Sequence, residues 1–125
     1  MFILKYLDSF GTPSAVPVEM VADVEYEAGL PLTSAGAVAE GEVKPAYICL
    51  EKAKGVAGEH VAAFRILPQH TFATVLTVAG TSLKVGDKVT LGTKGTGVTA
   101  TKTNGVAEIV RIDGTAIGDT VLVKF

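Results

Sequence analysis

The stretch TFATVLTV, residues 71–78, decides the structural class of this chain. In an extended conformation its side chains fall on two faces, with Phe72, Thr74, Leu76 and Val78 on one and Ala73, Val75 and Thr77 on the other. Both faces consist of apolar residues and threonine, and β-branched residues favour strands. The stretch therefore predicts a β-strand that is buried within a sheet.

Similar short stretches recur on both sides of it, separated by Gly- and Pro-containing turns. We expect further strands at 18–28 (one strand or a bent pair), 47–51, 60–67, 88–91, 97–101, 106–112 and 119–124. Asn104-Gly105 is typical of a two-residue hairpin turn. No apolar helical pattern persists along the chain. Short strands at this spacing predict an all-β fold, a small β-barrel or sandwich.

The chain has 125 residues, the usual size of one domain. We expect an irregular N-terminal arm at 1–17 and a single β domain at 18–125, because Gly11, Pro13 and Pro17 interrupt any regular element in the arm. The arm carries apolar side chains that we consider candidates for protein interaction: Phe2, Ile3, Leu4, Tyr6 and Phe10. They must pack either on their own domain or on a neighbouring molecule.

Composition excludes several classes of protein. Apolar residues make up 48% of the chain and the formal net charge is −2, so the totals favour a folded domain without a general attraction to nucleic acid or anionic membranes. No stretch is apolar enough to span a membrane, and Lys5 and Asp8 interrupt any signal peptide. We therefore expect synthesis and retention in the cytoplasm.

The charge is unevenly distributed along the chain. Residues 1–62 carry nine acidic residues and four lysines, whereas residues 63–125 carry four acidic and seven basic residues. The difference is compatible with simple scatter over a solvated surface. It is also compatible with copies that meet acidic part against basic part.

No pattern of residues predicts a catalytic, metal or cofactor site. Cys49 lies in an apolar run and is expected to be buried and inert. His60 and His70 lack the spacing of metal ligands, and no serine lies in a GxSxG motif. Glu25 and Glu27 share a strand face as solvated carboxylates. The prediction is a protein that is not an enzyme and holds neither a metal nor a cofactor.

Two lysines are the remaining candidates for an interaction site. The segment 92–97 contains glycines and a lysine but lacks a phosphate-binding motif, and it is expected to form a flexible hairpin tip. Lys94 and Lys102 would help this hairpin contact an acidic partner.

The sequence also contains one internal echo. Residues 83–91, LKVGDKVTL, and residues 115–123, TAIGDTVLV, share the order apolar, Gly, Asp, any residue, Val. A duplicated hairpin would explain it, but a Gly-Asp turn that precedes a strand is common in sheets. We interpret the echo as shared turn chemistry.

The middle of the chain resembles a known class of phage protein. The sequences AGLPL at 28–32, KPAYIC at 44–49 and AFRILPQHTFAT at 63–74 are similar to capsid decoration, or cement, proteins encoded with tailed-phage and prophage head genes. The resemblance covers roughly residues 20–80 and rests on a pattern of residues. Residues 83–125 carry no matching motif and are typical of a small β-barrel segment.

The resemblance implies a structural role without chemistry. Decoration proteins bind an assembled capsid lattice through the major capsid protein or another virion protein, often as homo-trimers, and are located on the capsid surface after synthesis in the bacterial cytoplasm. A tail protein or another virion component is a close alternative. A small β-barrel module that contacts nucleic acid or protein is the alternative from a different class, and it would require a basic groove or another binding surface.

Overall fold

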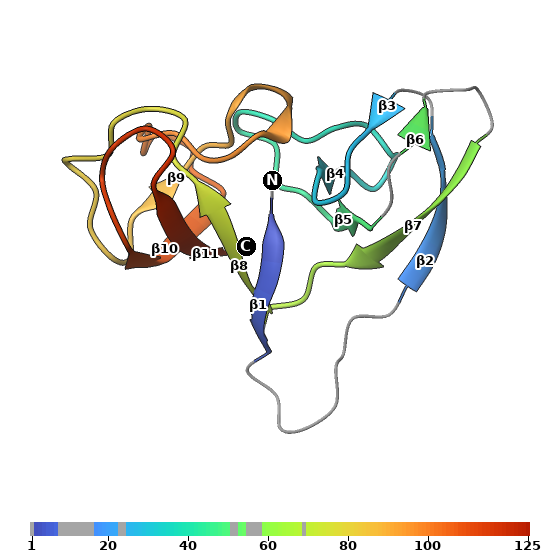
Figure 1. The fold of residues 1–125 in the computed structure, drawn as a ribbon, viewed down its shortest axis with the longest axis horizontal. Helices are drawn as coiled ribbons and strands as arrows, with labels where there is room; N and C mark the ends of the chain where they lie inside the picture. The colour runs from blue at the N-terminus through green and yellow to red at the C-terminus, as the bar shows by residue number, and fades with distance from the viewer. Residues whose placement is uncertain (1, 8–16, 23–24, 51–52, 55–58, 69) are drawn as a thin grey trace.

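The computed structural model confirms an all-β fold. It describes residues 2–7, 17–22, 25–50, 53–54, 59–68 and 70–125. Within these ranges the strands form a five-stranded, a four-stranded and a two-stranded antiparallel sheet, and no sheet closes into a barrel. Figure 1 shows the two larger sheets beside one another, in a sandwich-like arrangement with a shared core.

The five-stranded sheet contains the stretch that indicated the fold class. Its strands, in spatial order, are β1 (Ile3–Leu7), β8 (His70–Val75), β11 (Thr120–Lys124), β10 (Ala107–Ile112) and β9 (Lys88–Val89). The first five residues of β8 are buried, because β1 and β11 flank it and side chains cover both of its faces. The prediction of a buried strand within 71–78 is thus confirmed.

The four-stranded sheet uses the residues before β8. Its order is β2 (Pro17–Ala22), β7 (Glu59–Arg65), β5 (Tyr47–Cys49) and β4 (Pro31–Leu32), while β3 (Glu25–Tyr26) and β6 (Ala53–Lys54) form the two-stranded sheet. The predicted strand or bent pair at 18–28 is a bent pair, since β2 and β3 belong to different sheets.

The N-terminal region contains a strand where an irregular arm was expected. Strand β1 pairs antiparallel with β8, from Ile3 opposite Ala73 to Leu7 opposite His70, with a register shift between Leu4 and Tyr6. The breaking residues Gly11 and Pro13 lie after this strand and outside the described residues, so they do not prevent residues 3–7 from pairing. Tertiary pairing with an already buried strand is the physical reason for the difference.

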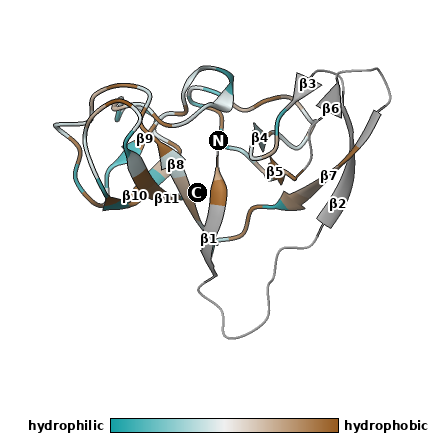
Figure 2. Ribbon diagram, viewed as in Figure 1, coloured by the Kyte–Doolittle hydropathy of each residue, from teal (hydrophilic) through white to brown (hydrophobic). Residues whose placement is uncertain are grey.

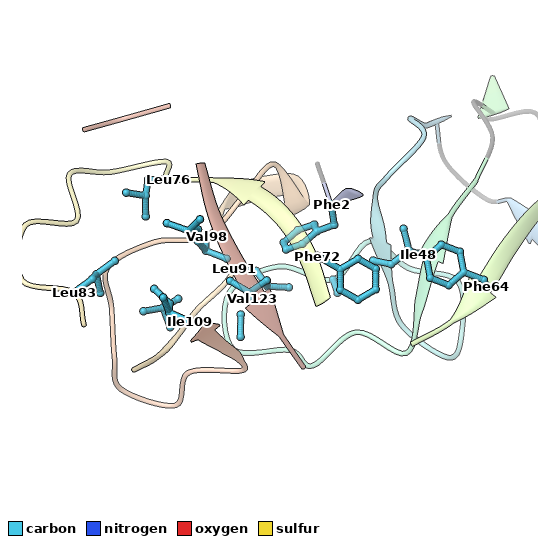
Figure 3. Close-up of a cluster of buried hydrophobic side chains, with 14 residues drawn as sticks. Phe2, Ile48, Phe64, Phe72, Leu76, Leu83, Leu91, Val98, Ile109 and Val123 are labelled. Atoms are coloured by element: carbon cyan, nitrogen blue, oxygen red, sulfur yellow. The ribbon is translucent and has the colours of Figure 1, made fainter. Parts of the chain in front are cut away.

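A chain of aromatic rings joins the two larger sheets. The Phe2 ring lies 5.5 Å from that of Phe125, which lies 5.7 Å from Phe72, and Phe72 lies 6.0 Å from Phe64 on β7. Figure 3 shows the main core extending from Leu83 past Phe72 to Phe64. Rings at these separations attract one another in addition to burying apolar area. The core therefore ties the start and the end of the sequence to both sheets.

The four-stranded sheet buries apolar side chains on both faces. On β5 and β7, Ile48 and Phe64 point into the main core, whereas Cys49 and Ala63 belong to a second cluster with Leu32. This alternation follows from the two-residue period of a strand. Cys49 is 1% exposed, which confirms its predicted burial.

The structure contains a turn at Asn104-Gly105 but differs from the sequence prediction at 97–101. In the turn the Gly105 N–H donates to the Lys102 carbonyl at 3.4 Å, and Asn104 has φ 55°. Residues 97–101 form no regular strand; Val98 instead makes single bridges with Leu76 and Leu91. The segment lies close to β8, because an added Cβ at Gly97 would be 2.3 Å from the Val75 carbonyl oxygen. The predicted hairpin partner, β10, pairs with β9 and β11.

A hairpin tip forms at 92–97, as predicted. The Gly92 N–H donates to the Gly97 carbonyl at 2.8 Å, and the 3₁₀ turn η1 (Thr93–Gly95) lies between these residues. An added Cβ at Gly95 would be 2.7 Å from Pro31 Cδ, so the tip packs against a residue of the four-stranded sheet, and its flexibility stays a prediction.

Candidate functional site

Two turns of the same construction stand out among the described residues. In residues 84–87 the Asp87 backbone N–H donates to the Lys84 carbonyl at 3.1 Å, and the Asp87 carboxylate accepts from the Lys84 N–H at 2.8 Å. In residues 116–119 Asp119 makes the same two bonds with Ala116, both 3.0 Å long. Each turn is therefore closed by two hydrogen bonds.

Glycine at the third position allows both turns to form. Gly86 has φ 96° and Gly118 has φ 88°, the left-handed values that a type II turn requires there. The second position is then at the tip of the turn and is occupied by Val85 in one turn and Ile117 in the other. The two segments of the internal echo therefore form the same turn, and the interpretation as shared turn chemistry stays a prediction.

Both turns lie at the same end of the five-stranded sheet. The strands that follow them, β9 and β11, pair antiparallel with β10 on its two sides, so they run in the same direction. The turns are level with different residues of β10: the Gly86 N–H donates to the Ile109 carbonyl, whereas the second turn lies beyond Ile112, which pairs with Val121. In Figure 1 these loops lie at the left end of the molecule, away from the four-stranded sheet.

The loop after β8 joins the second turn. The Gly118 N–H donates to the Leu76 carbonyl at 2.8 Å, and the Gly80 N–H donates to the Thr115 carbonyl at 2.8 Å. Val78 lies between these two attachment points in the sequence. Figure 2 shows hydrophobic colour mixed with hydrophilic colour along the loops at this end.

Three exposed aliphatic side chains lie in the loops around these two turns. Val78, Val85 and Ile117 are 42%, 66% and 70% exposed, and we call them the end surface. Apolar side chains that are held outward by closed turns, and grouped, are typical of an interaction surface. The echo is visible in the sequence. Its tip residues were not predicted as candidates, because a Gly-Asp motif does not show whether the residue before it is buried or exposed.

Lys102, an exposed residue, contacts the turn that carries Val85. Its ammonium group lies 3.1 Å from the Asp87 carboxylate and donates to the Ser82 carbonyl at 3.1 Å. The hydrogen bond from the Lys84 backbone, together with Lys102, holds the pKa of Asp87 below its usual value. The predicted contact with an acidic partner remains a prediction, but in the structure Lys102 pairs with an acidic residue of its own chain.

Lys94 lies elsewhere and is not brought together with Lys102. It has φ 57°, and its backbone N–H donates to the Glu40 carboxylate. Because different segments hold the two lysines, the structure provides no common hairpin tip for them. An interaction by Lys94, which is exposed, remains a prediction.

The N-terminal candidates occupy several environments. Phe2 is 2% exposed and belongs to the main core, so it packs on its own domain and is not a contact residue on the surface. Ile3 is 62% exposed. Leu4 and Tyr6 lie on β1, and Phe10 lies outside the described residues.

His70 is a buried polar residue at the junction of the two sheets. Its Nδ1 accepts the Leu67 N–H at 3.1 Å, and no partner of Nε2 is found among the described residues. The ring makes edge contacts with Phe64 and Phe72, and burial lowers the pKa of His70. These contacts give His70 a structural role in the turn between β7 and β8.

Within the described ranges, no group of three or more potential metal-ligating side chains is found. No helix in these ranges is long and apolar enough to cross a membrane. The sequence matches no protein-family model, and no curated protein shows significant similarity to it.

Proposed function

We propose that this protein is a structural component of a tailed-phage or prophage virion, a capsid decoration protein that stabilises the head lattice without catalysis. The end surface is the observation that carries the proposal, because three aliphatic side chains are exposed in the loops at the same end of the molecule. The resemblance of residues 28–32, 44–49 and 63–74 to decoration proteins supports the same role.

The end surface is suited to binding a fixed lattice because its backbone is already ordered. Each tip residue stands on a turn that is closed by a backbone and a carboxylate hydrogen bond, so little conformational entropy would be lost on contact. Many identical copies on one shell would add avidity to a small contact. The proposal includes assembly as a homo-trimer and attachment to the major capsid protein.

The test is cosedimentation with purified, undecorated heads of the phage or prophage that encodes the chain. The expected result is saturable binding that is lost in the Val85→Ser/Ile117→Ser double variant. A Val43→Ser/Leu50→Ser variant is the matched control, because these two side chains are also exposed but lie outside the end surface. Failure of the unmodified protein to bind heads would overturn the proposal.

Light scattering over a range of concentrations gives a second measurement. If the unmodified protein is a trimer and the Val85→Ser/Ile117→Ser variant is not, the end surface lies between copies. If the variant remains a trimer, the end surface is available to contact the capsid. Binding to nucleic acid or to a cellular protein, without binding to heads, would favour the alternative of a small β-domain binding module.

A further inference from the structure

A pocket lies on the five-stranded sheet, beside the first residues of β10. Its volume is about 320 Å³, and its lining residues are Lys44, Lys88, Gly105, Val106, Glu108, Lys124 and Phe125. This volume is near the lower end of the range for ligand sites and equals roughly ten water molecules. It is sufficient for two or so side chains of a peptide, and neither the sequence patterns nor the proposed function uses it.

The sheet register places three charged side chains in a row across the pocket. Glu108 on β10 lies directly opposite Lys88 on β9 and opposite Lys124 on β11. The neighbouring residue Ile109 is buried in the main core, so Glu108 belongs to the outward face of the sheet. Lys44 adds a third ammonium group from the segment that precedes β5.

The apolar part of the pocket is formed by residues that are half-buried. Val106 and Phe125 pack against the main core and also line the pocket. The Gly105 backbone closes one side, where an added Cβ would lie 2.1 Å from the Lys88 carbonyl oxygen. The pocket thus combines ammonium donors with a fixed apolar wall.

These features select one chemical class of ligand. Lysines are point charges, and no arginine, which would offer a bidentate fork to phosphate, lines the pocket. Glu108 stands between two of the lysines and would repel a compact dianion more strongly than a single carboxylate. A carboxylate that is attached to an apolar neighbour satisfies both the lysines and the wall.

We propose that this pocket recognises an acidic peptide segment of a partner protein, in which an Asp or Glu carboxylate contacts the lysines and an adjacent apolar side chain lies against Val106 and Phe125. The inference goes beyond the proposed function, since it concerns a different surface and holds for any partner that presents such a segment.

The experiment is an NMR titration of the ¹⁵N-labelled full chain with two peptides, acetyl-Gly-Glu-Leu-Gly-amide and acetyl-Gly-Gln-Leu-Gly-amide. We expect the Glu peptide to shift the amide signals of Lys88, Val106, Glu108 and Lys124, and the uncharged Gln peptide to shift them far less. No shift with the Glu peptide, or shifts spread over other surfaces, would overturn the proposal. Inorganic phosphate is the third probe, and binding as tight as that of the Glu peptide would overturn the preference for a carboxylate.

Single substitutions test the assignment of the charges. Lys88→Gln and Lys124→Gln should each weaken Glu-peptide binding about threefold, the effect expected for a partly exposed ion pair. Lys84→Gln is the matched control, since it removes the same charge outside the pocket. Glu108→Gln should strengthen binding of both the Glu peptide and phosphate. If the control variant weakens binding as much as the pocket variants do, the peptide binds through general surface charge and the proposed site is wrong.

Discussion

Apolar side chains are buried at one end of the five-stranded sheet and exposed at the other. At the inner end the tilted rings of Phe2 and Phe72 lie in the main core, where Phe72 is 0% exposed, and Phe125 packs against them. At the outer end Val85 and Ile117 stand on closed turns with most of their surface exposed. The inner residues stabilise the fold by packing, whereas the outer residues are positioned by turns that their own side chains do not stabilise.

This difference separates residues that fold the protein from residues that are available to partners. The outer turns keep their shape through backbone and Asp hydrogen bonds, so their tip side chains contribute little to the shape. Removing an inner side chain should therefore lower the free energy of unfolding, and removing an outer one should lower the affinity for a partner. Four substitutions or conditions test this separation.

The largest effect is expected for Phe72→Ala. This change removes a ring that contacts both Phe64 and Phe125, and we expect the free energy of unfolding to fall by about 3–5 kcal/mol. Such a loss is a large fraction of the ~5–15 kcal/mol of a typical domain. Urea denaturation followed by circular dichroism measures it. A loss below about 1 kcal/mol would contradict the central place of the aromatic chain.

Gly114→Ala tests how the outer turns are held. A Cβ at position 114 would lie 2.2 Å from Asp119 Oδ2 and would displace the carboxylate that closes the turn. Overpacking of this kind costs about 1–3 kcal/mol. In the Gly114→Ala/Asp119→Ala double variant the loss of stability should be smaller than the sum of the two single losses, because the displaced group is gone. Additive losses, measured by the same denaturation, would show that Gly114 acts independently of the turn.

Acid should weaken the inner end before the outer end. Burial lowers the folded-state pKa of His70 below its ordinary value of about 6.5, so the unfolded chain binds a proton more readily. The stability that His70 contributes is present above pH ~6.5 and is lost as the pH falls toward its folded pKa. Asp87, whose pKa is also lowered, contributes above its ordinary value of about 3.8 and is affected only at lower pH.

Thermal unfolding between pH 7 and pH 5 measures this effect. His70→Asn is the informative variant, because an Asn side-chain oxygen can still accept the Leu67 N–H but does not titrate. Its melting temperature should depend less on pH in this interval than that of the unmodified protein. If the variant and the unmodified protein show the same pH dependence of the melting temperature, titratable groups other than His70 cause it.

The smallest change in stability is expected at the end surface. Val85→Ser and Ile117→Ser should each alter the free energy of unfolding by no more than about 0.5 kcal/mol, as is usual for exposed positions. The same urea denaturation gives the values. A loss above about 2 kcal/mol would place these side chains among those that stabilise the fold and remove the basis for a docking role.

Local patterns were sufficient for much of the fold. Alternation in 71–78 predicted β8, the apolar run around Cys49 predicted a buried strand, and the Gly-Asp echo predicted two similar turns. These predictions succeeded because each depends on residues that are neighbours in the sequence. The prediction for 97–101 differed from the structure because Val98 bridges two different segments, at Leu76 and at Leu91, and neither bridge extends into a ladder.

The candidate sites depended more strongly on long-range contacts. Lys94 and Lys102 are close in the sequence, yet one is attached to Glu40 and the other to Asp87. Phe2, which the sequence placed on an arm, is buried beside Phe125 at the other end of the chain. Neither outcome follows from a local pattern, because the partners are distant in the sequence.

The sequence by itself determined the all-β class, the absence of helical periodicity, and the turn chemistry of Gly86-Asp87 and Gly118-Asp119. Only the tertiary structure decided which apolar residues are buried, and it alone placed Lys88, Glu108 and Lys124 in one row. The physical reason is that turn conformation follows from adjacent residues, whereas burial and the composition of a surface follow from strand pairing over long sequence distances.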